Sequence, residues 1–316
     1  MSEAKCIPTR DAYGDEILEL GRENANIFVV DADIGKSCKT SAFAKELPNQ
    51  HVNVGIAEQN ACGVGAGLAT CGKIPFVTTY AVFGSMRMSE QIRQEVCYPH
   101  LNVKIACSHG GLTPANDGAS HQGIEDMGIL RTIPNMVVVM GCDYWSVRKL
   151  VRAAAAYDGP VYLRFTRDAM PLIYDETDSF ELGKANLLRE GRDATIIANG
   201  DVMSVAMAAV DELAMQGISV RLLDMHTIKP IDRDAVVAAI EETGAIVTVE
   251  DHNIMNGLGS AVCEIVAEHG GAKVRRIGIR DCFGESAPYK RLLEKNGITK
   301  EAIAETCKTL MEDKNR

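Results

Sequence analysis

Short runs of β-branched and apolar residues alternate with longer helical patterns along the whole chain. We expect strands at residues 26–33, 51–55, 74–80, 102–108, 136–141, 161–166, 193–199, 218–225, 245–250 and 274–280. We expect helices between them near 10–22, 57–71, 85–97, 122–132, 143–156, 201–216, 232–242, 257–269, 287–295 and 299–312. Apolar strands that are connected through helices form parallel sheets covered on both faces. The pattern therefore predicts an α/β fold with doubly wound, mostly parallel sheets.

A segment rich in Pro, Asp and Thr, residues 168–183, interrupts this alternation before it starts again. A chain of 316 residues is long enough for two domains of ordinary size. We therefore predict a first α/β domain at 1–170, a linker at 171–187 and a second α/β domain at 188–316.

Composition excludes several classes of partner and location. The chain has 33 Lys and Arg against 43 Asp and Glu, so it has no general attraction for nucleic acid or for an anionic membrane. No apolar run is long enough to span a bilayer, and Met-Ser-Glu-Ala-Lys-Cys at the start lacks the apolar core of a signal peptide. The ten cysteines show no C-x-x-C pair and no zinc-type spacing. We expect a cytoplasmic protein with reduced thiols.

Ligands of open parallel sheets bind beyond the carboxyl ends of the strands, so the residues that follow each strand are the candidates for function. Glu58 follows the strand at 51–55 and starts a helix, a position that the helix dipole favours for any carboxylate. Tyr80 and Phe83 follow the next strand, where aromatic residues are often part of a core. Taken singly, these three residues do not decide between structure and function.

Three glycines after Glu58 have the spacing G-x-G-x-G, at residues 63, 65 and 67. They lie inside a helical pattern and not at a turn between a strand and a helix, so they do not fit a dinucleotide-binding fingerprint. We expect them to allow close packing of that helix.

The segment between the strand at 102–108 and the following helix is more informative. It places His109, Asp117 and His121 in one loop rich in Gly, Pro and Asn. Packing explains such a loop poorly, and imidazoles beside a carboxylate can move protons near neutral pH. The spacing does not favour a metal site. We predict that this loop is functional.

Motifs in both halves of the chain resemble transketolases that depend on thiamine diphosphate. The family's pyrimidine-binding domain is similar to PTRDAYGD, DADIGKS, NVGIAEQNACGVGAGLA, GKIPFVTTYAVF, DGASHQGIEDMGILRTIPNM and GPVYLRFTR. Its C-terminal domain is similar to MHTIKPID, GAIVTVEDH and NGLGSAV. The family's GDG…N motif, which holds the diphosphate and Mg²⁺, does not occur in this sequence. The resemblance therefore implies the C-terminal subunit of a split transketolase, which binds only the pyrimidine side of the cofactor.

The resemblance also implies cofactor contacts for individual residues. Glu58 matches the family's carboxylate that meets a ring nitrogen of the aminopyrimidine, and Tyr80 and Phe83 match the aromatic residues that flank this ring. Asp33 matches a residue near the cofactor. Met86 stands where many members carry a further aromatic residue, which implies a softer wall. No metal ligand is expected on this chain, because Mg²⁺ or Ca²⁺ would belong to the partner.

The substrate is implied to contact a second group of residues. His109 and His121 match histidines that hydrogen-bond the substrate and shuttle protons, and Asp117 matches a carboxylate that recognises a hydroxyl group. The phosphate of the sugar is implied to bind the residues matching Arg10, Arg167 and Ser37. The forked guanidinium suits a phosphate. The stretch GLTPAND departs from the family pattern beside the substrate, which leaves the acceptor preference open.

The function expected from these residues is transfer of a two-carbon ketol unit between sugar phosphates, by a heterotetramer of this chain and an N-terminal partner subunit. Two related enzymes remain as alternatives, the β subunit of a 2-oxo acid dehydrogenase and one half of a split 1-deoxyxylulose-5-phosphate synthase. A partner subunit without catalytic residues is a third alternative, which Glu58 and the histidines disfavour.

Overall fold

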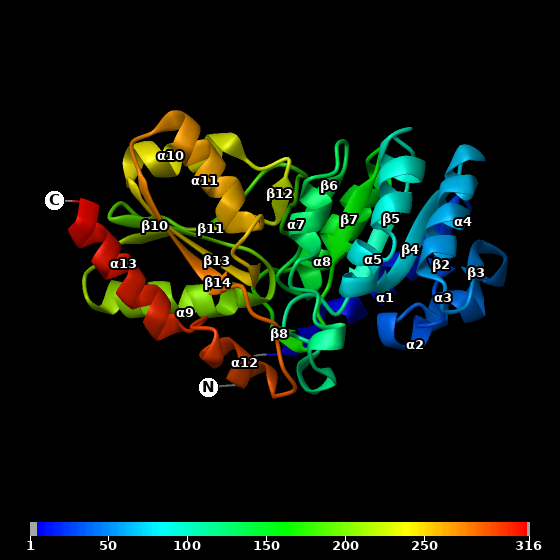
Figure 1. The fold of residues 1–316 in the computed structure, drawn as a ribbon, viewed down its shortest axis with the longest axis horizontal. Coiled ribbons are helices and arrows are strands. Elements are labelled where there is room, and N and C mark those ends of the chain that lie inside the picture. The colour runs from blue at the N-terminus through cyan, green and yellow to red at the C-terminus, as the bar shows by residue number, and fades with distance from the viewer. Residues whose placement is uncertain (1–4, 315–316) are drawn as a thin grey trace.

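The computed structural model describes residues 5–314, which form two α/β domains lying side by side (Figure 1). The first domain contains, in chain order, β1 (Cys6–Pro8), α1 (Thr9–Glu23), β2 (Ile27–Asp31), α2 (Gly35–Cys38), α3 (Ser41–Glu46), β3 (His51–Asn53), α4 (Glu58–Thr70), β4 (Ile74–Tyr80), α5 (Ala81–Met86), α6 (Ser89–Gln91), β5 (Lys104–Ser108), α7 (Asp126–Arg131), β6 (Val137–Met140), α8 (Tyr144–Ala156), β7 (Val161–Arg164) and β8 (Ala169–Pro171). The second domain contains β9 (Asn186–Arg189), β10 (Ala194–Ala198), α9 (Met203–Met215), β11 (Val220–Asp224), β12 (Thr227–Lys229), α10 (Arg233–Glu242), β13 (Ala245–Asn253), α11 (Leu258–His269), β14 (Lys273–Ile279), α12 (Tyr289–Lys295) and α13 (Lys300–Lys314).

Each domain is built on one large sheet. The first sheet has the order β12-β6-β7-β5-β4-β2-β3, and its strands are parallel except for β12. The second has the order β14-β13-β10-β11-β9 and is parallel except for β9. A short antiparallel pair, β1 and β8, forms a third sheet. The predicted fold class, two α/β domains with mostly parallel sheets, is confirmed.

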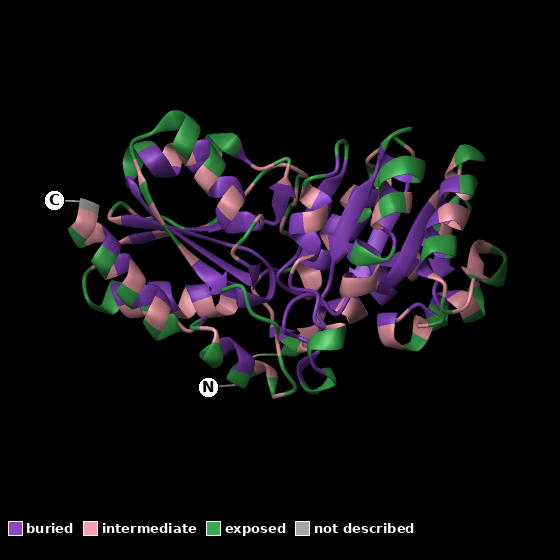
Figure 2. Cartoon of the chain, in the orientation of Figure 1, coloured by how far each residue is buried: buried purple, intermediate pink, exposed green. Residues whose placement is uncertain are grey.

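Successive residues of the central strands face two different cores, which is why these strands read as continuous apolar runs. Phe76 and Ala106 pack on the side of α1 and α8, whereas Val77 and Cys107 pack on the side of α4. The second of these cores continues into the other domain, where it includes Leu258 of α11. Figure 2 shows the buried strands between helices that expose only their outer sides.

The structure differs from the sequence prediction mainly in short elements. The helix expected at 85–97 is instead α5, α6 and a π-helical turn at Ile92–Cys97, and the helix expected at 122–132 begins only at Asp126. Strands β1, β8, β9 and β12 have three or four residues each, too few for a readable alternation.

The strand β12 joins the two predicted domains. It belongs by sequence to the second half, yet it pairs with β6 at the edge of the first sheet. The division at 1–170, 171–187 and 188–316 stays a prediction, and the pairing of β12 shows that the two halves share backbone hydrogen bonds.

No helix within residues 5–314 is long and apolar enough to cross a membrane. Four residues of the N-terminal stretch considered for a signal peptide lie outside the described part of the chain.

Candidate active site

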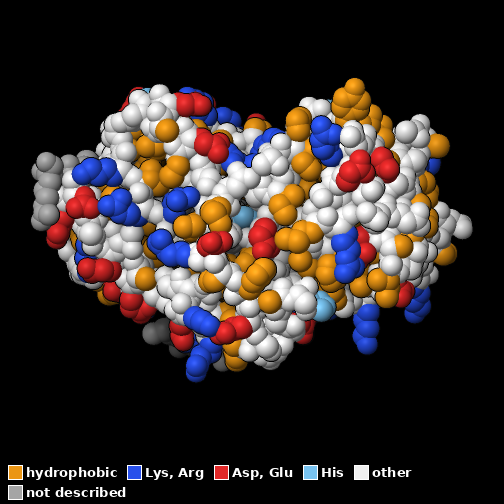
Figure 3. Space-filling view, viewed as in Figure 1, with side chains coloured by type: hydrophobic (Ala, Val, Ile, Leu, Met, Phe, Trp, Pro, Cys, Tyr) orange, Lys and Arg blue, Asp and Glu red, His pale blue; other side chains and the backbone are white. Residues whose placement is uncertain are grey.

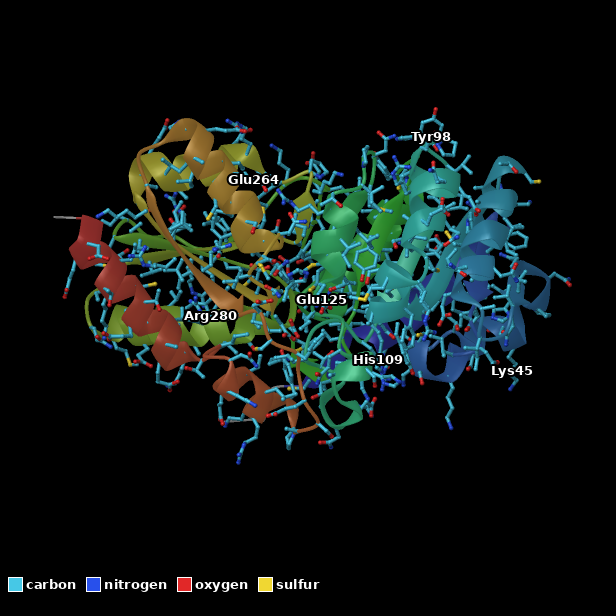
Figure 4. The ribbon with its side chains drawn as sticks, in the orientation of Figure 1. Lys45, Tyr98, His109, Glu125, Glu264 and Arg280 are labelled. Atoms are coloured by element: carbon cyan, nitrogen blue, oxygen red, sulfur yellow. The ribbon has the colours of Figure 1, made fainter. Side chains whose placement is uncertain are left out.

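The carboxyl ends of neighbouring strands meet at one edge of the first sheet. Tyr80, the last residue of β4, lies opposite Ser108, the last residue of β5. Cys107 in turn lies opposite Arg164 at the end of β7. The loops that follow these strands are therefore adjacent, although they are far apart in sequence. Figure 4 shows His109 at this edge, near the boundary of the two domains.

Four predicted site residues form a cluster of rings at this edge. The ring centroids of Tyr80 and His109 are 3.9 Å apart, and those of Tyr80 and Phe83 are 5.8 Å apart. The His121 ring lies 5.8 Å from Tyr80 and 5.9 Å from Phe83. The structure thus brings together two imidazoles from the loop after β5, the last residue of β4 and a side chain of α5.

Glu58 lies at the first position of α4, where the helix dipole favours a negative charge. Only 6% of its surface is exposed. Its two carboxylate oxygens accept hydrogen bonds from Nη1 of Arg87, at 3.2 and 3.3 Å. The same guanidinium lies over the Phe83 ring, 4.4 Å from its centroid. The Arg87 side chain is 54% exposed, so this contact lies at the mouth of the site.

Burial and nearby positive charge keep His109 neutral. Burial lowers the pKa of His109 to about 3, and the guanidinium groups of Arg10 and Arg167 contribute to this lowering. Its Nδ1 lies 2.8 Å from Oγ of Ser108, whose hydroxyl lies 3.1 Å from Sγ of Cys38. A neutral imidazole with one nitrogen held in this way presents the other to a ligand. His109 also has a φ of 63°, a strained value for a residue other than Gly.

The two predicted phosphate-binding arginines lie at the rim of the cluster. Arg10, in the first turn of α1, donates from Nη1 to the backbone oxygen of Ser37 at 3.0 Å. Arg167 forms an ion pair with Asp117 at 3.0 Å and also donates to the backbone oxygen of Pro114. The Arg167 and Asp117 side chains are about one-third exposed, so both are accessible to a ligand.

Asp33 lies apart from this cluster. It is exposed, has a φ of 64° and accepts a hydrogen bond from Nδ2 of Asn53 at 3.0 Å. Among the described residues, no hydrogen bond or ring contact joins it to the aromatic pair. Its assignment to the cofactor stays a prediction. Met86 is 45% exposed at the end of α5, beside the site.

Sequence reasoning missed two residues that contact the predicted site. Arg87 follows Phe83 by four residues, the spacing at which side chains on one helical face meet, and this was a readable signal. Ser108 gave no signal, because it reads as the end of a buried strand. Across residues 5–314, no group of three or more His, Cys, Asp or Glu is placed to hold a metal ion.

Comparison with known families identifies the fold that carries this site. The family model of the transketolase pyrimidine-binding domain matches residues 5–172, and that of the transketolase C-terminal domain matches residues 183–303. The chain belongs to the transketolase family. The rings, Glu58 and both arginines of this transketolase chain all lie within the pyrimidine-binding domain, as the motifs predicted.

The transketolase chain is similar over nearly its full length to short family members. It is 45% identical to a putative transketolase C-terminal section of Methanocaldococcus jannaschii, over 96% of this chain and 95% of that protein. It is 42% identical to one of the subunits of an apulose-4-phosphate transketolase of Phocaeicola vulgatus, over 97% of both chains. Among solved structures, a split-gene transketolase described as an inactive β4 tetramer superposes with a TM-score of 0.90, at 45% identity over 98% of this chain and 99% of that chain. The predicted resemblance to split transketolases is therefore confirmed.

Proposed function

We propose that this chain is the C-terminal subunit of a split transketolase, which, with a partner chain, transfers a two-carbon ketol unit from a ketose phosphate to an aldose phosphate. One observation carries the proposal: Glu58, the Tyr80–Phe83 pair and two imidazoles meet at one sheet edge of a pyrimidine-binding domain. Thiamine diphosphate, when bound, supplies the nucleophilic carbon that breaks and re-forms the bond next to the sugar carbonyl.

The side chains of Glu58 and Phe83 at this edge fit the aminopyrimidine ring of that cofactor. In this chain the flat guanidinium of Arg87 lies over the Phe83 ring and donates to both oxygens of Glu58. The Glu58 and Phe83 side chains therefore accommodate a flat group that carries N–H donors. An aminopyrimidine has the same character, and we propose that it makes the same two contacts in place of Arg87.

In this mechanism Glu58 holds a proton at a nitrogen of the pyrimidine ring. The side chain suits this role because it is buried, ionisable and fixed at a helix N-terminus. Tyr80 and Phe83 provide an apolar wall that excludes water from the shared proton.

The histidines and arginines are proposed to handle the sugar. His109 remains neutral, so its free ring nitrogen can donate to, or accept from, a hydroxyl or carbonyl group. His121, on the same ring cluster, is the proposed proton shuttle. Arg10 and Arg167 would hold the phosphate with charge-assisted hydrogen bonds, and Asp117 would accept from a sugar hydroxyl.

We propose that the diphosphate and its Mg²⁺ or Ca²⁺ are held by a separate N-terminal subunit. The sequence lacks the GDG motif, and the described residues offer no cluster of metal ligands. Ile56 and Met86 expose 78% and 45% of their surface beside Glu58 and Arg87, and Figure 3 shows hydrophobic side chains exposed over the first domain. Such a surface suits burial against further subunits in a heterotetramer. The solved relative described as an inactive β4 tetramer agrees with a chain that needs a partner.

Substitution of Glu58 by Gln tests this function. The amide keeps the size and the hydrogen-bonding capacity of Glu58 but cannot share an ionisable proton with the pyrimidine. In the complex reconstituted with the partner chain, we expect kcat to fall by about 10²–10⁴-fold, with little change in KM for the sugar. Deuterium exchange at the thiazolium carbon should slow in parallel.

The exposed Glu90, on the nearby helix α6, provides a matched control, because Glu90→Gln should leave both rates unchanged. If deuterium exchange at the thiazolium carbon is as fast in Glu58→Gln as in the wild type, Glu58 has only a structural role at the start of its helix, and the cofactor assignment is contradicted. Comparing turnover of xylulose 5-phosphate with that of pyruvate separates a transketolase from the two alternative enzymes.

A further inference from the structure

The loop that carries both histidines, residues 109–121, is hydrogen-bonded to the second domain. We call it the histidine loop. The backbone N–H of Leu112 donates to Oδ2 of Asp251, which belongs to β13, at 2.8 Å. Gly111 has a φ of 63°, and a Cβ at this position would lie only 2.1 Å from the same carboxylate oxygen. The backbone of the histidine loop is therefore fitted closely around Asp251.

Asp251 belongs to a pair of buried carboxyl groups. Its neighbour is Asp201, in the short turn before α9, which packs on β13; the two side chains lie within hydrogen-bonding reach of each other, and both residues are at most 3% exposed. Oδ2 of Asp201 accepts from the hydroxyl of Tyr289 at 2.7 Å, and Oδ2 of Asp251 accepts from Leu112. The Oδ1 atom of each carboxyl group is buried without a hydrogen-bond partner. One proton held between the two Oδ1 atoms would satisfy both.

The charges around the pair also favour such a proton. The buried guanidinium of Arg164 forms an ion pair with Asp126 at 2.9 Å and donates to the backbone oxygen of Asp251 at 3.0 Å. Asp126 already balances this positive charge, so two more buried anions would be largely uncompensated. Burial raises the pKa of Asp201, and it raises that of Asp251 well above its usual range. Burial also lowers the pKa of His252, which disfavours a second positive charge beside the pair.

We infer that Asp251 and Asp201 share one proton and act as positioning residues, through which the second domain sets the place of the histidine loop. In this arrangement Asp251 is the protonated acid: its Oδ1–H donates to Oδ1 of Asp201, and its Oδ2 accepts from Leu112. The consequence for sugar binding by the histidines rests on the proposed function, whereas the position of the loop does not.

An asparagine at position 251 imitates the protonated acid, and this gives the decisive comparison. The amide oxygen of Asp251→Asn can accept from Leu112, and its NH₂ group can donate to Asp201. Asp251→Ala can do neither. By hydrogen–deuterium exchange on the full chain, we expect peptides from the histidine loop to exchange at least about 10-fold faster in Asp251→Ala, and at the wild-type rate in Asp251→Asn.

Asp224→Ala serves as the matched control. Asp224 is equally buried in the same domain and accepts from the hydroxyl of Tyr174, but within residues 5–314 no hydrogen bond joins its side chain to the histidine loop. We expect this variant to lose thermal stability while exchange in the histidine loop stays at the wild-type rate. A comparable increase in Asp224→Ala would show general loosening and would overturn the inference.

Two further outcomes overturn the proposal: an unchanged exchange rate of the histidine loop in Asp251→Ala, or an Asp251→Asn variant whose histidine loop exchanges as fast as that of Asp251→Ala.

If Asp251→Ala does not fold, the wild type and Asp251→Asn are compared as the pH is raised. Loss of the shared proton should speed exchange of the histidine loop in the wild type but not in Asp251→Asn, which has no such proton to lose. In the reconstituted complex, KM for the sugar phosphate should rise several-fold in Asp251→Ala and recover in Asp251→Asn. The expected exchange pattern without any turnover would contradict the proposed function and leave this inference intact.

Discussion

Among single residues, Arg87 has the most direct relation to the proposed cofactor site. Its guanidinium contacts both Glu58 and the Phe83 ring, the two groups that the pyrimidine is proposed to contact. A pyrimidine that binds as proposed therefore requires Arg87 to move first. An ion pair at a half-exposed position contributes about 0.2–1 kcal/mol, and a cation over an aromatic ring contributes a similar amount.

We therefore predict that Arg87→Met binds thiamine diphosphate more tightly than the wild type in the reconstituted complex. The expected gain is about 3- to 10-fold in Kd, from the loss of roughly 1 kcal/mol of competing contacts. Calorimetric titration with thiamine diphosphate in the presence of Mg²⁺ measures it. Arg93→Met, at an exposed position on the adjoining turn, is the control and should not change Kd. Weaker binding by Arg87→Met would mean that Arg87 supports the cofactor rather than competing with it.

Residues that follow strands were predictable from sequence, whereas residues that act across long chain separations were not. Glu58, Tyr80 and His109 follow or end β3, β4 and β5, and the parallel-sheet rule places such positions at one edge. Asp251 contacts Leu112 across 139 residues, and no local pattern records this pairing. Ser108 contacts the adjacent His109, but its sequence context is that of a core strand.

At the scale of elements, the histidine loop places an uncharged imidazole where charging it is costly. The pKa of His109 lies near 3, against about 6.5 for an exposed histidine. Below pH 6.5 His109 therefore binds a proton in the unfolded chain but stays unprotonated in the folded chain. The free energy of unfolding should fall as pH decreases from about 6.5 toward 3, by up to about 1.4 kcal/mol per pH unit from this group.

Acid unfolding of His109→Gln tests this contribution. Glutamine removes the titrating group, so its stability should depend less steeply on pH than that of the wild type over this range. The loss of stacking on Tyr80 lowers stability by an amount that does not vary with pH, so the slopes of the two curves are compared. His269→Gln, at an exposed position of α11 far from the ring cluster in sequence, serves as the comparison for removal of an imidazole outside the site. Parallel curves for His109→Gln and the wild type would contradict the assignment of a low pKa to His109.

The long elements of this fold were predictable, and the short ones depend on tertiary contacts. The prediction for β4 agrees with the structure at both ends, since its seven residues are mostly apolar or β-branched. The strand β12 has three residues and exists because β6 offers a free edge. The irregular run from α5 through the π-helical turn also follows tertiary packing, because it carries Phe83 and Arg87 at the site and Val96 in the core.

On the scale of the whole molecule, the two domains form one continuous structure around the site. A shared core, the pairing of β12 with β6 and the hydrogen bond of Asp251 all cross between them. The sequence predicted two domains but not how they contact each other, because the contacts join segments with no common pattern. The second domain is therefore part of what holds the histidine loop in place.

The partner requirement is the prediction that concerns the molecule as a whole. Thiamine diphosphate carries two phosphate groups. Residues 5–314 contain no cluster of metal ligands that could hold them through Mg²⁺, and the sequence has no GDG motif. We expect the isolated chain to bind thiamine diphosphate with Mg²⁺ at least about 100-fold more weakly than the reconstituted complex, a difference of about 2.7 kcal/mol. Calorimetric titration of the chain alone, and then with an N-terminal partner that carries GDG…N, measures both affinities. Glu58→Gln in the complex separates pyrimidine contacts from diphosphate contacts. We expect the Glu58→Gln complex to lose much less affinity for thiamine diphosphate than the isolated wild-type chain does.

Tight binding of thiamine diphosphate at one site per isolated chain would show that this chain holds the diphosphate itself, and the split arrangement would then be wrong.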